Sequence, residues 1–177
     1  MRNHNLAFTI SAEVTHAHDA QEMIKQGREL ISIDPHILVK IPLTKEGLRA
    51  VNQLSDEGIR CNVTLCFSAN QALLAAKAGA HVVSPFIGRI DDQGGNGLEL
   101  IREIRTIYDR YGFETHILAA SIRSAEHVLE CARIGADIAT MPLSIYEKLY
   151  HHELTDTGLA QFEEDWNAYE RTHAKKS

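Results

Sequence analysis

The stretch Ile37-Leu38-Val39-Lys40-Ile41-Pro42 is apolar enough to form a buried β-strand, yet it carries a lysine near its centre. Lysine is among the residues least often buried, because an ammonium group in apolar surroundings is costly unless it is paired or loses its proton. A partly desolvated lysine becomes a free amine, which attacks carbonyls to form a Schiff base. The alternative is a lysine that snorkels from a strand end, with its stem buried and its head in water.

The composition excludes several classes of protein. A chain of 177 residues is long enough for one domain with a substantial core, and we expect residues 1–177 to form it. The net charge of -6 and the pI near 5.9 argue against a nucleic-acid or membrane partner. Cys61, Cys66 and Cys131 are odd in number and lack CxxC spacing, so we expect reduced, buried thiols. Residues 1–10 lack the apolar core of a signal peptide, and together these features predict a cytoplasmic protein.

Short apolar runs alternate with amphipathic stretches along the whole chain, which predicts an α/β fold of six βα units around a parallel sheet. Several of the helical stretches end at a glycine, which takes the left-handed conformation without steric cost. The strands are expected at residues 7–14, 37–41, 61–67, 81–87, 116–121 and 138–141. The helices are expected at residues 18–31, 45–57, 69–78, 97–110, 124–134 and 156–171, with short helices after residue 144.

Six βα units fit two architectures. A doubly wound sheet accommodates six strands, whereas a (β/α)8 barrel needs eight. Polar residues recur late in the predicted strands, and parallel α/β enzymes assemble their sites at the carboxyl ends of strands. For any one position the alternative is a strand-end residue that is satisfied by local backbone. The polar residues are Glu13, Asn62, Thr64, Ser84 and Ser121.

Two arginines suggest a phosphorylated substrate. Arg123 follows Ser121 between a late strand and a helix, and helix amides together with a guanidinium can hold a dianion there. If that strand continues, Ser121 and Arg123 share a face, as Ser84 and Phe86 do on the preceding strand. Arg89 is a weaker candidate. The alternative for both arginines is an ordinary surface salt bridge.

Ordered motifs along nearly the whole chain resemble the transaldolase family, most closely its short bacterial type, which is related to fructose-6-phosphate aldolase. The resemblance implies the (β/α)8 TIM-barrel fold of class I aldolases, here represented by six βα units that correspond to family strands 3 to 8, followed by a C-terminal helix. The motifs are residues 38–47, residues 61–68 with Gln71, residues 84–92, residues 119–123, residues 140–142 and residues 162–166.

The resemblance also implies roles for individual residues. Lys40 would form the imine with a ketose phosphate, while Glu13 and Thr64 would act with it through an ordered water. The substrate would be held by Asn62, Ser84, Phe86, Arg89, Ser121 and Arg123. His16 and His18 lie at a predicted helix start, where capping is a better explanation than metal binding. No metal or organic cofactor is implied, because the protonated imine is itself the electron sink.

The implied reaction moves a three-carbon dihydroxyacetone unit from sedoheptulose 7-phosphate or fructose 6-phosphate to an aldose phosphate, as in the pentose phosphate pathway. An alternative is a lyase of the fructose-6-phosphate aldolase type. Phe86 stands where those aldolases have tyrosine, and phenylalanine donates no hydrogen bond, so this position favours a transaldolase.

The family places two further βα units before the strand of Glu13, and one of them bears an acid–base aspartate. Neither their Leu-Asp-Thr nor their Thr-Asn-Pro motif occurs in this sequence. We therefore hypothesise that the chain derives from a longer reading frame or relies on a partner, and a non-catalytic remnant is a second alternative. Phe162, Trp166 and Tyr169 share one face of the last helix, which predicts either packing on the chain's own barrel or a homo-oligomer contact. The short members of the family form decamers.

Overall fold

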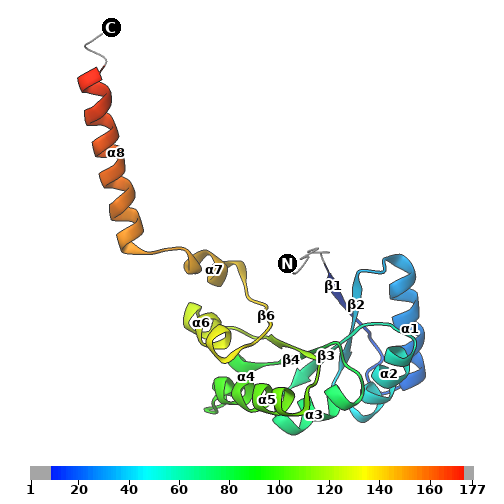
Figure 1. Ribbon diagram of the computed structural model, residues 1–177. Coiled ribbons are helices and arrows are strands. Elements are labelled where there is room, and N and C mark those ends of the chain that lie inside the picture. The colour runs from blue at the N-terminus through cyan, green and yellow to red at the C-terminus, as the bar shows by residue number, and fades with distance from the viewer. Residues whose placement is uncertain (1–8, 174–177) are drawn as a thin grey trace. The chain divides into compact units, whose positions relative to one another are not determined.

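The computed structural model describes residues 9–173 and divides the chain into two compact units at the Met141–Pro142 junction. The first unit contains a six-stranded sheet with the helices α1 to α6, and Figure 1 shows these helices on the outer side of a curved sheet. The second unit contains α7 (Leu143–Tyr146), a 3-10 turn at Glu147–Leu149 and α8 (Glu153–His173). Each unit is described on its own below.

The sheet of the first unit is parallel throughout, and its strands lie in the order β1-β2-β3-β4-β5-β6. A doubly wound sheet reverses its strand order at a switch point, whereas a barrel adds each strand beside the previous one. The sequential order therefore decides for the barrel class of α/β fold. The strands are β1 (Ile10–Glu13), β2 (Ile37–Pro42), β3 (Cys61–Cys66), β4 (Val82–Pro85), β5 (His116–Ala119) and β6 (Ile138–Ala139).

Side-chain caps start the long helices of the first unit. Each capping oxygen accepts a hydrogen bond from a backbone N–H of the first turn, which would otherwise lack a partner. The capped helices are α1 (Ala20–Ile33, capped by Asp19), α2 (Lys45–Asp56, Thr44), α3 (Ala69–Lys77, Ser68), α5 (Gly97–Tyr111, Asn96) and α6 (Ala125–Ile134, Ser124). The capping role predicted for the His16–Asp19 segment is thus confirmed at Asp19.

The helices bury their apolar faces against the outer side of the sheet. Met23 and Leu54 are fully buried on α1 and α2, as is Tyr108 on α5. The Tyr108 hydroxyl donates a 2.8 Å hydrogen bond to the Ala72 carbonyl oxygen and so ties α5 to α3. Burial raises the pKa of this hydroxyl. The layer of helices therefore shields one face of every central strand from water.

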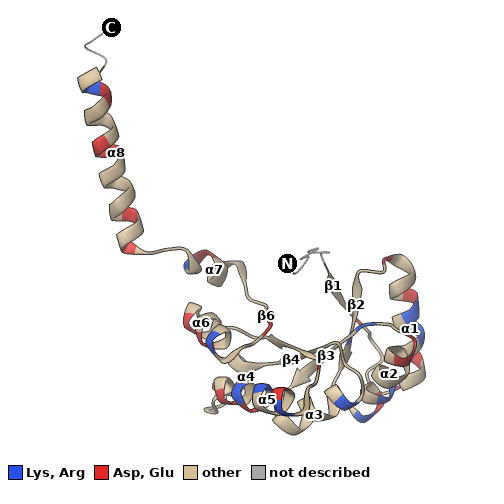
Figure 2. Cartoon of the chain, viewed as in Figure 1, with Lys and Arg blue, Asp and Glu red and all other residues tan. Residues whose placement is uncertain are grey.

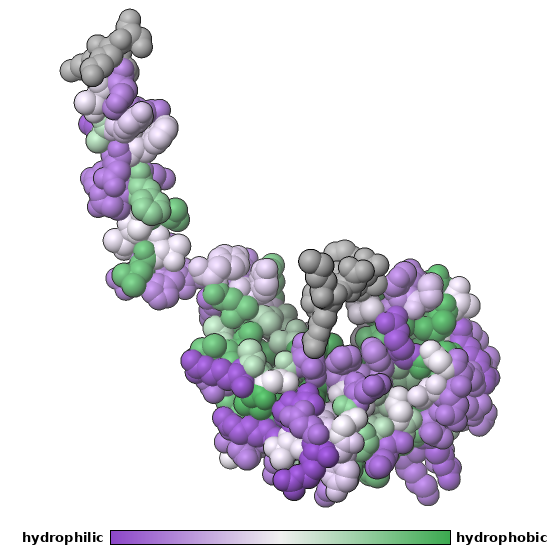
Figure 3. All heavy atoms as spheres, in the orientation of Figure 1, coloured by the Kyte–Doolittle hydropathy of each residue, from purple (hydrophilic) through white to green (hydrophobic). Residues whose placement is uncertain are grey.

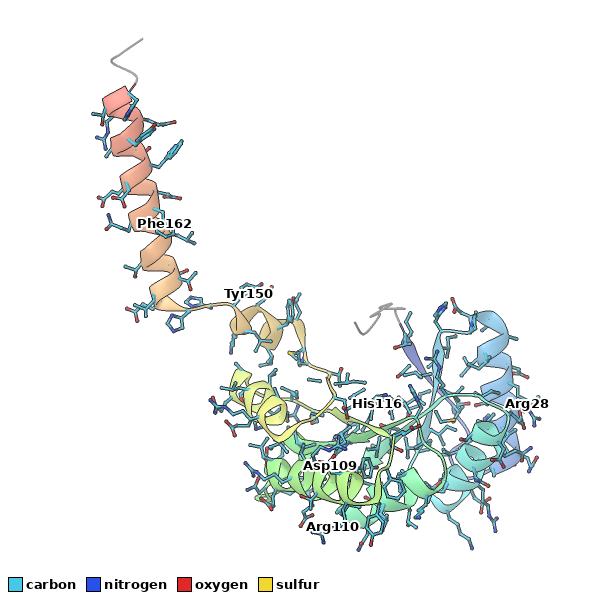
Figure 4. All side chains as sticks on the ribbon, in the orientation of Figure 1. Arg28, Asp109, Arg110, His116, Tyr150 and Phe162 are labelled. Atoms are coloured by element: carbon cyan, nitrogen blue, oxygen red, sulfur yellow. The ribbon has the colours of Figure 1, made fainter. Side chains whose placement is uncertain are left out.

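Charged residues are distributed along these helices (Figure 2), and the labelled side chains of Arg28 and Arg110 point away from the sheet (Figure 4). Arg28 of α1 makes a bidentate pair with Glu57, which follows α2, at 2.6 and 2.9 Å. Hydrogen bonding from Arg28 lowers the pKa of the Glu57 carboxyl. Figure 3 shows the same outer surface as predominantly hydrophilic. These charged side chains of the helices therefore lie in solvent and do not line the inner face of the sheet.

The predicted elements agree with the structure apart from β4, β5 and β6, and the strand expected at residues 138–141 is observed only at Ile138–Ala139. The expected strand 81–87 ends at Pro85, and residues 87–91 form a short helix, α4 (Ile87–Asp91), that the sequence reading missed. The expected strand 116–121 ends at Ala119, and the predicted start of the first strand at Ala7 lies outside the described residues. Both strands end early because the backbone turns there to build loops, as described below.

Candidate active site

Lys40 and Glu13 stand opposite each other on neighbouring strands. The β1–β2 register pairs Glu13 with Lys40, and the Lys40 Nζ lies 3.0 Å from a Glu13 carboxylate oxygen. Val39 and Ile41 on either side of the lysine are fully buried, while the lysine side chain keeps 27% of its surface exposed. Since side chains alternate along a strand, Lys40 lies on the inner face, opposite to the helices. The Lys40 side chain is therefore partly buried, and part of its surface remains accessible to solvent.

Asn62 continues the polar row on β3. It pairs in register with Lys40 and is 2% exposed. Its amide nitrogen donates to the Ser11 hydroxyl at 3.0 Å, and its amide oxygen accepts from the Ser84 hydroxyl at 2.7 Å. This chain of hydrogen bonds runs from β1 to β4 and passes beside Lys40. It fixes the Asn62 amide in one orientation. Together with Lys40 and Glu13, it forms a row of polar side chains across β1 to β4.

Thr64 is the remaining polar residue of the row. It is 1% exposed, and within residues 9–173 its hydroxyl has no hydrogen-bond partner. Buried hydroxyls are normally satisfied, so an unsatisfied one marks a place for a water molecule or a ligand atom. By the period of two, Thr64 faces the same side as Asn62 and therefore the same side as Lys40. The hydroxyl is available to a bound molecule at the inner face.

A distortion at the end of β3 separates this row from a cysteine. Regular alternation would place Cys66 on the face of Asn62 and Thr64, but Leu65 has a left-handed φ of 62° and the register with β4 shifts between Val63 and Cys66. The Cys66 thiol donates to a backbone carbonyl, and burial raises its pKa to about 12. The cysteines predicted to be buried and unpaired are indeed free and buried, and Cys66 offers no thiolate.

A second group of predicted residues lies where β4 meets α4. Phe86 forms an isolated parallel bridge with Ala120, and the Arg89 guanidinium stacks over the Phe86 ring at 4.8 Å. Phe86 follows Ser84 by two residues, so this group continues directly from the polar row. Phe86 lies one residue beyond the end of β4 at Pro85 and is joined to the neighbouring segment by that isolated bridge.

Ser121 and Arg123 lie in the loop between β5 and α6. The expectation that they extend the strand is wrong, because Ser121 has a left-handed φ of 61° and turns the chain out of the sheet. The Arg123 guanidinium pairs with Asp92 at 2.7 Å, and both side chains are about half exposed. The salt bridge given as the alternative for the two arginines is thus observed for Arg123.

The sequence reading missed two contributors, Ser11 and His127. Ser11 receives a hydrogen bond from Asn62, and its position two residues before Glu13 was the available signal, because both then face the same side of β1. Asp91 accepts from the Gly97 backbone N–H at 2.7 Å, and its other oxygen lies 3.2 Å from the His127 ring. No local pattern pointed to His127, whose neighbours come from another loop.

In the described part of the chain, no three or more His, Cys, Asp or Glu side chains gather as metal ligands would. None of its helices is both long enough and apolar enough to span a membrane. The polar row therefore consists of a lysine, a carboxylate, an amide and hydroxyls, which are the groups of acid–base and nucleophilic chemistry.

The sequential parallel sheet, with a lysine and a carboxylate on its inner face, defines an α/β barrel-type protein with its polar groups inside the arc. The family model of transaldolase/fructose-6-phosphate aldolase matches residues 5–174, and the chain belongs to this family. The resemblance drawn from the sequence motifs is thereby confirmed.

Several relatives are similar over most of the chain. A probable transaldolase of Ruegeria pomeroyi is 60% identical over 159 residues, which are 90% of this chain and 73% of the relative. Probable transaldolases of Methanococcus maripaludis strain C5 and Caulobacter vibrioides are 57% and 59% identical; the matches span 90% and 89% of this chain, and 74% and 72% of those relatives. The similarity supports a transaldolase-type enzyme at the level of the family.

Proposed function

We propose that this chain carries the Schiff-base centre of a transaldolase, with Lys40 as the nucleophile. The observation that carries the proposal is the Lys40 amine on the inner face, 3.0 Å from Glu13 and in register with Asn62. Attack needs an unprotonated amine, and the Glu13 carboxylate is close enough to accept the proton through a hydrogen bond or one water. A carboxylate within hydrogen-bond reach of the amine is the geometry of a general base beside its nucleophile.

The proposed reaction begins when the Lys40 amine attacks the ketone carbon of a ketose phosphate and water leaves to form an iminium ion. The C4 hydroxyl then gives its proton to the bound water, the bond between C3 and C4 breaks, and its electron pair moves toward the iminium nitrogen. An aldose phosphate departs with an enamine left on Lys40. The enamine carbon attacks the aldehyde of the acceptor, whose oxygen takes a proton back from the same water, and hydrolysis of the iminium frees the amine again. Thr64 and Glu13 would hold the water that moves protons, since the Thr64 hydroxyl is buried and unsatisfied within the described residues.

The phosphate of the substrate would bind at the second group of residues. Arg89 and Arg123 bring two guanidinium groups to the loops that follow β4 and β5. Guanidinium groups bind phosphate oxygens in a fixed, bidentate geometry. Ser84 and Ser121 would bind substrate hydroxyls between the arginines and the lysine. Sedoheptulose 7-phosphate and fructose 6-phosphate are the proposed donors, which places the reaction in the pentose phosphate pathway.

The competing activity is release of free dihydroxyacetone by a fructose-6-phosphate aldolase-type lyase. Phe86 lies beside Arg89 and Phe67, with ring centroids of the two phenylalanines 5.9 Å apart. An apolar ring at this position donates no proton to water near the enamine, which favours transfer to an aldehyde over hydrolytic release. A coupled assay with and without an aldose phosphate acceptor separates the two activities.

Borohydride trapping tests the nucleophile directly. The wild-type chain, incubated with fructose 6-phosphate and borohydride, should gain the mass of a reduced adduct at Lys40. Lys40→Met should gain none, and Lys45→Met, at an exposed lysine five residues on, should label as the wild type does. Absence of an adduct on Lys40 in the wild type would reject the proposal. An adduct without transfer to an acceptor would instead favour the non-catalytic alternative.

Oligomer formation is part of the proposal. Within the second unit no side chain described in α8 is buried, and Phe162 and Trp166 are 71% and 60% exposed, with Phe162 labelled in Figure 4. Large exposed apolar side chains on one helix favour a contact with another copy of the chain. Equilibrium sedimentation of the wild type and of Phe162→Ser/Trp166→Ser tests this, since only the wild type should associate.

The free, buried cysteines are consistent with a cytoplasmic location.

A further inference from the structure

The first turn of α4 approaches the loop after β5 more closely than a side chain would allow. A Cβ placed on Gly88 would lie 2.0 Å from the Ser121 carbonyl oxygen and 2.8 Å from the Arg123 Cγ. The backbone oxygen cannot be relieved by a rotamer change, unlike the end of a flexible side chain. Gly88 has no left-handed φ, so the glycine is required by the close approach and not by its own conformation.

Ser121 is the other half of this contact. Its φ of 61° is left-handed, a conformation that is strained for a residue with a Cβ. Backbone hydrogen bonds hold the chain on either side of the contact: Ala120 N–H donates to the Pro85 carbonyl at 2.9 Å, and Ile87 N–H donates to the Ala120 carbonyl at 3.0 Å. These two backbone hydrogen bonds therefore hold the strained turn at Ser121 against the end of β4.

The contact between Gly88 and Ser121 joins the two segments that carry the arginines of the proposed phosphate site. Arg89 directly follows Gly88 in α4, and Arg123 follows Ser121 by two residues in the β5–α6 loop. The Arg123 backbone N–H also donates to the His127 Nδ1 at 3.4 Å, which holds the far side of the loop. The backbone contact between Gly88 and Ser121 therefore holds together the two elements that carry the guanidinium groups.

We propose that Gly88 is a positioning residue, which seats the Ser121 loop against α4 so that Arg89 and Arg123 bind one phosphate dianion. The inference rests on the proposed function and adds the element that sets the geometry of phosphate binding. Bidentate contacts depend strongly on geometry, and a misplacement of about 1 Å can cost as much as 100-fold in a well-oriented site. A side chain at position 88 has to move the Ser121 carbonyl by more than that.

Gly88→Ala is the test. Binding of inorganic phosphate, measured by calorimetry, should weaken by about tenfold or more, which corresponds to about 1.4 kcal/mol. KM for fructose 6-phosphate should rise by a similar factor while kcat changes little. Borohydride trapping of Lys40 with dihydroxyacetone, which has no phosphate, should proceed as in the wild type. This split between phosphorylated and unphosphorylated ligands separates positioning from a general loss of structure.

Gly47→Ala is the matched control. A Cβ at Gly47 would lie 2.0 Å from the Pro42 carbonyl oxygen, so the backbone clash is equally severe but lies between α2 and β2. Its phosphate affinity should stay close to that of the wild type. Equal loss of phosphate binding in both variants, or unchanged binding in a folded Gly88→Ala protein, overturns the proposal.

A second comparison covers the case in which Gly88→Ala does not fold. Ser121→Gly removes the strain of the left-handed turn and lets the carbonyl move away, and Gly88→Ala is then added to it. The double variant should bind phosphate about tenfold more weakly than Ser121→Gly alone; equal affinity overturns the proposal. Calorimetry needs no turnover, so a wild type that binds phosphate without trapping at Lys40 contradicts the proposed function and not the role of Gly88.

Discussion

Lys40 and Glu13 are partners across the β1–β2 pair, with the lysine nitrogen 3.0 Å from the carboxylate. The pairing comes from strand register, because these two residues occupy matching positions on adjacent parallel strands. The lysine had two explanations from sequence, a snorkelling side chain and a nucleophile. The carboxylate held beside it on the inner face supplies the proton acceptor that the proposed nucleophile requires.

Glu13→Gln should slow imine formation without abolishing it. Glutamine keeps the shape of the side chain but cannot accept the lysine proton, and a positioned acid–base group contributes about 10²–10⁴-fold in rate. Rapid-quench borohydride trapping measures the rate of adduct formation at Lys40. Glu46→Gln, in the first turn of α2, is the control and should trap at the wild-type rate. An unchanged rate in Glu13→Gln would remove Glu13 from the proposed proton transfer.

Asn62→Ala should destabilise the fold through the hydrogen bonds it removes. Ser84 is 2% exposed and its hydroxyl donates to Asn62 at 2.7 Å, so it would be left without that acceptor. A buried unsatisfied group costs about 1–3 kcal/mol. In urea unfolding, Asn62→Ala/Ser84→Ala should lose less than the sum of the two single variants. Additive losses would show that the two side chains are not coupled.

Tyr108→Phe should lower the free energy of unfolding by about 1–2 kcal/mol, because the Ala72 carbonyl would lose a buried 2.8 Å hydrogen bond. Lys40 trapping should be unaffected, since the contact lies in the helix layer. Tyr111→Phe is the control: that ring is 67% exposed, and its loss of a hydroxyl should cost little. Equal effects of the two substitutions on urea unfolding would contradict the assignment.

Acid should destabilise the first unit through His81. Burial, together with nearby His116 and Arg60, lowers the pKa of His81 from its ordinary 6.5. The unfolded chain then binds the proton more tightly, so the free energy of unfolding falls as pH drops below about 6.5 and levels off below the folded pKa. His116, labelled in Figure 4, packs edge-to-face on the His81 ring at 5.2 Å.

His81→Asn should flatten the pH dependence of stability in that range, because asparagine does not titrate. Urea unfolding of the wild type and the variant at pH 7, 6 and 5 measures the difference. A variant whose stability falls with pH as steeply as that of the wild type would assign the acid sensitivity to other groups.

Local features of the sequence were enough to predict most of the elements. The caps at Asp19, Thr44, Ser68 and Ser124 and the glycines that follow α2, α3 and α6 act within a few residues, so their signals lie in short windows. The same holds for the buried strands, whose apolar residues are contiguous. The family resemblance came from ordered motifs and required no structure, and the family match confirms it.

The ends of β4 and β5 could not be read in the same way. Ser121 and Leu65 adopt left-handed conformations, which serine and leucine rarely do, so the residue types did not predict them. Each of these conformations changes which neighbouring residues face the site. The helix α4 begins where the pattern predicted strand, because Phe86 and Ile87 bond to the next strand at Ala120 and then turn. The apolar pattern of residues 81–87 predicted a strand to its end, but contacts with a distant segment of the chain determine where the strand stops.

The amino-acid order was sufficient for the class of fold, for the family and for Lys40 as the centre of interest, since each depends on residue type and spacing along the chain. Only the tertiary structure decided the strand order and the neighbours of that lysine. Ser11 and Asn62 are 51 residues apart in sequence and 3.0 Å apart in space, and Gly88 meets Ser121 through backbone atoms. Such contacts depend on register and on the path of the backbone, which no single segment specifies.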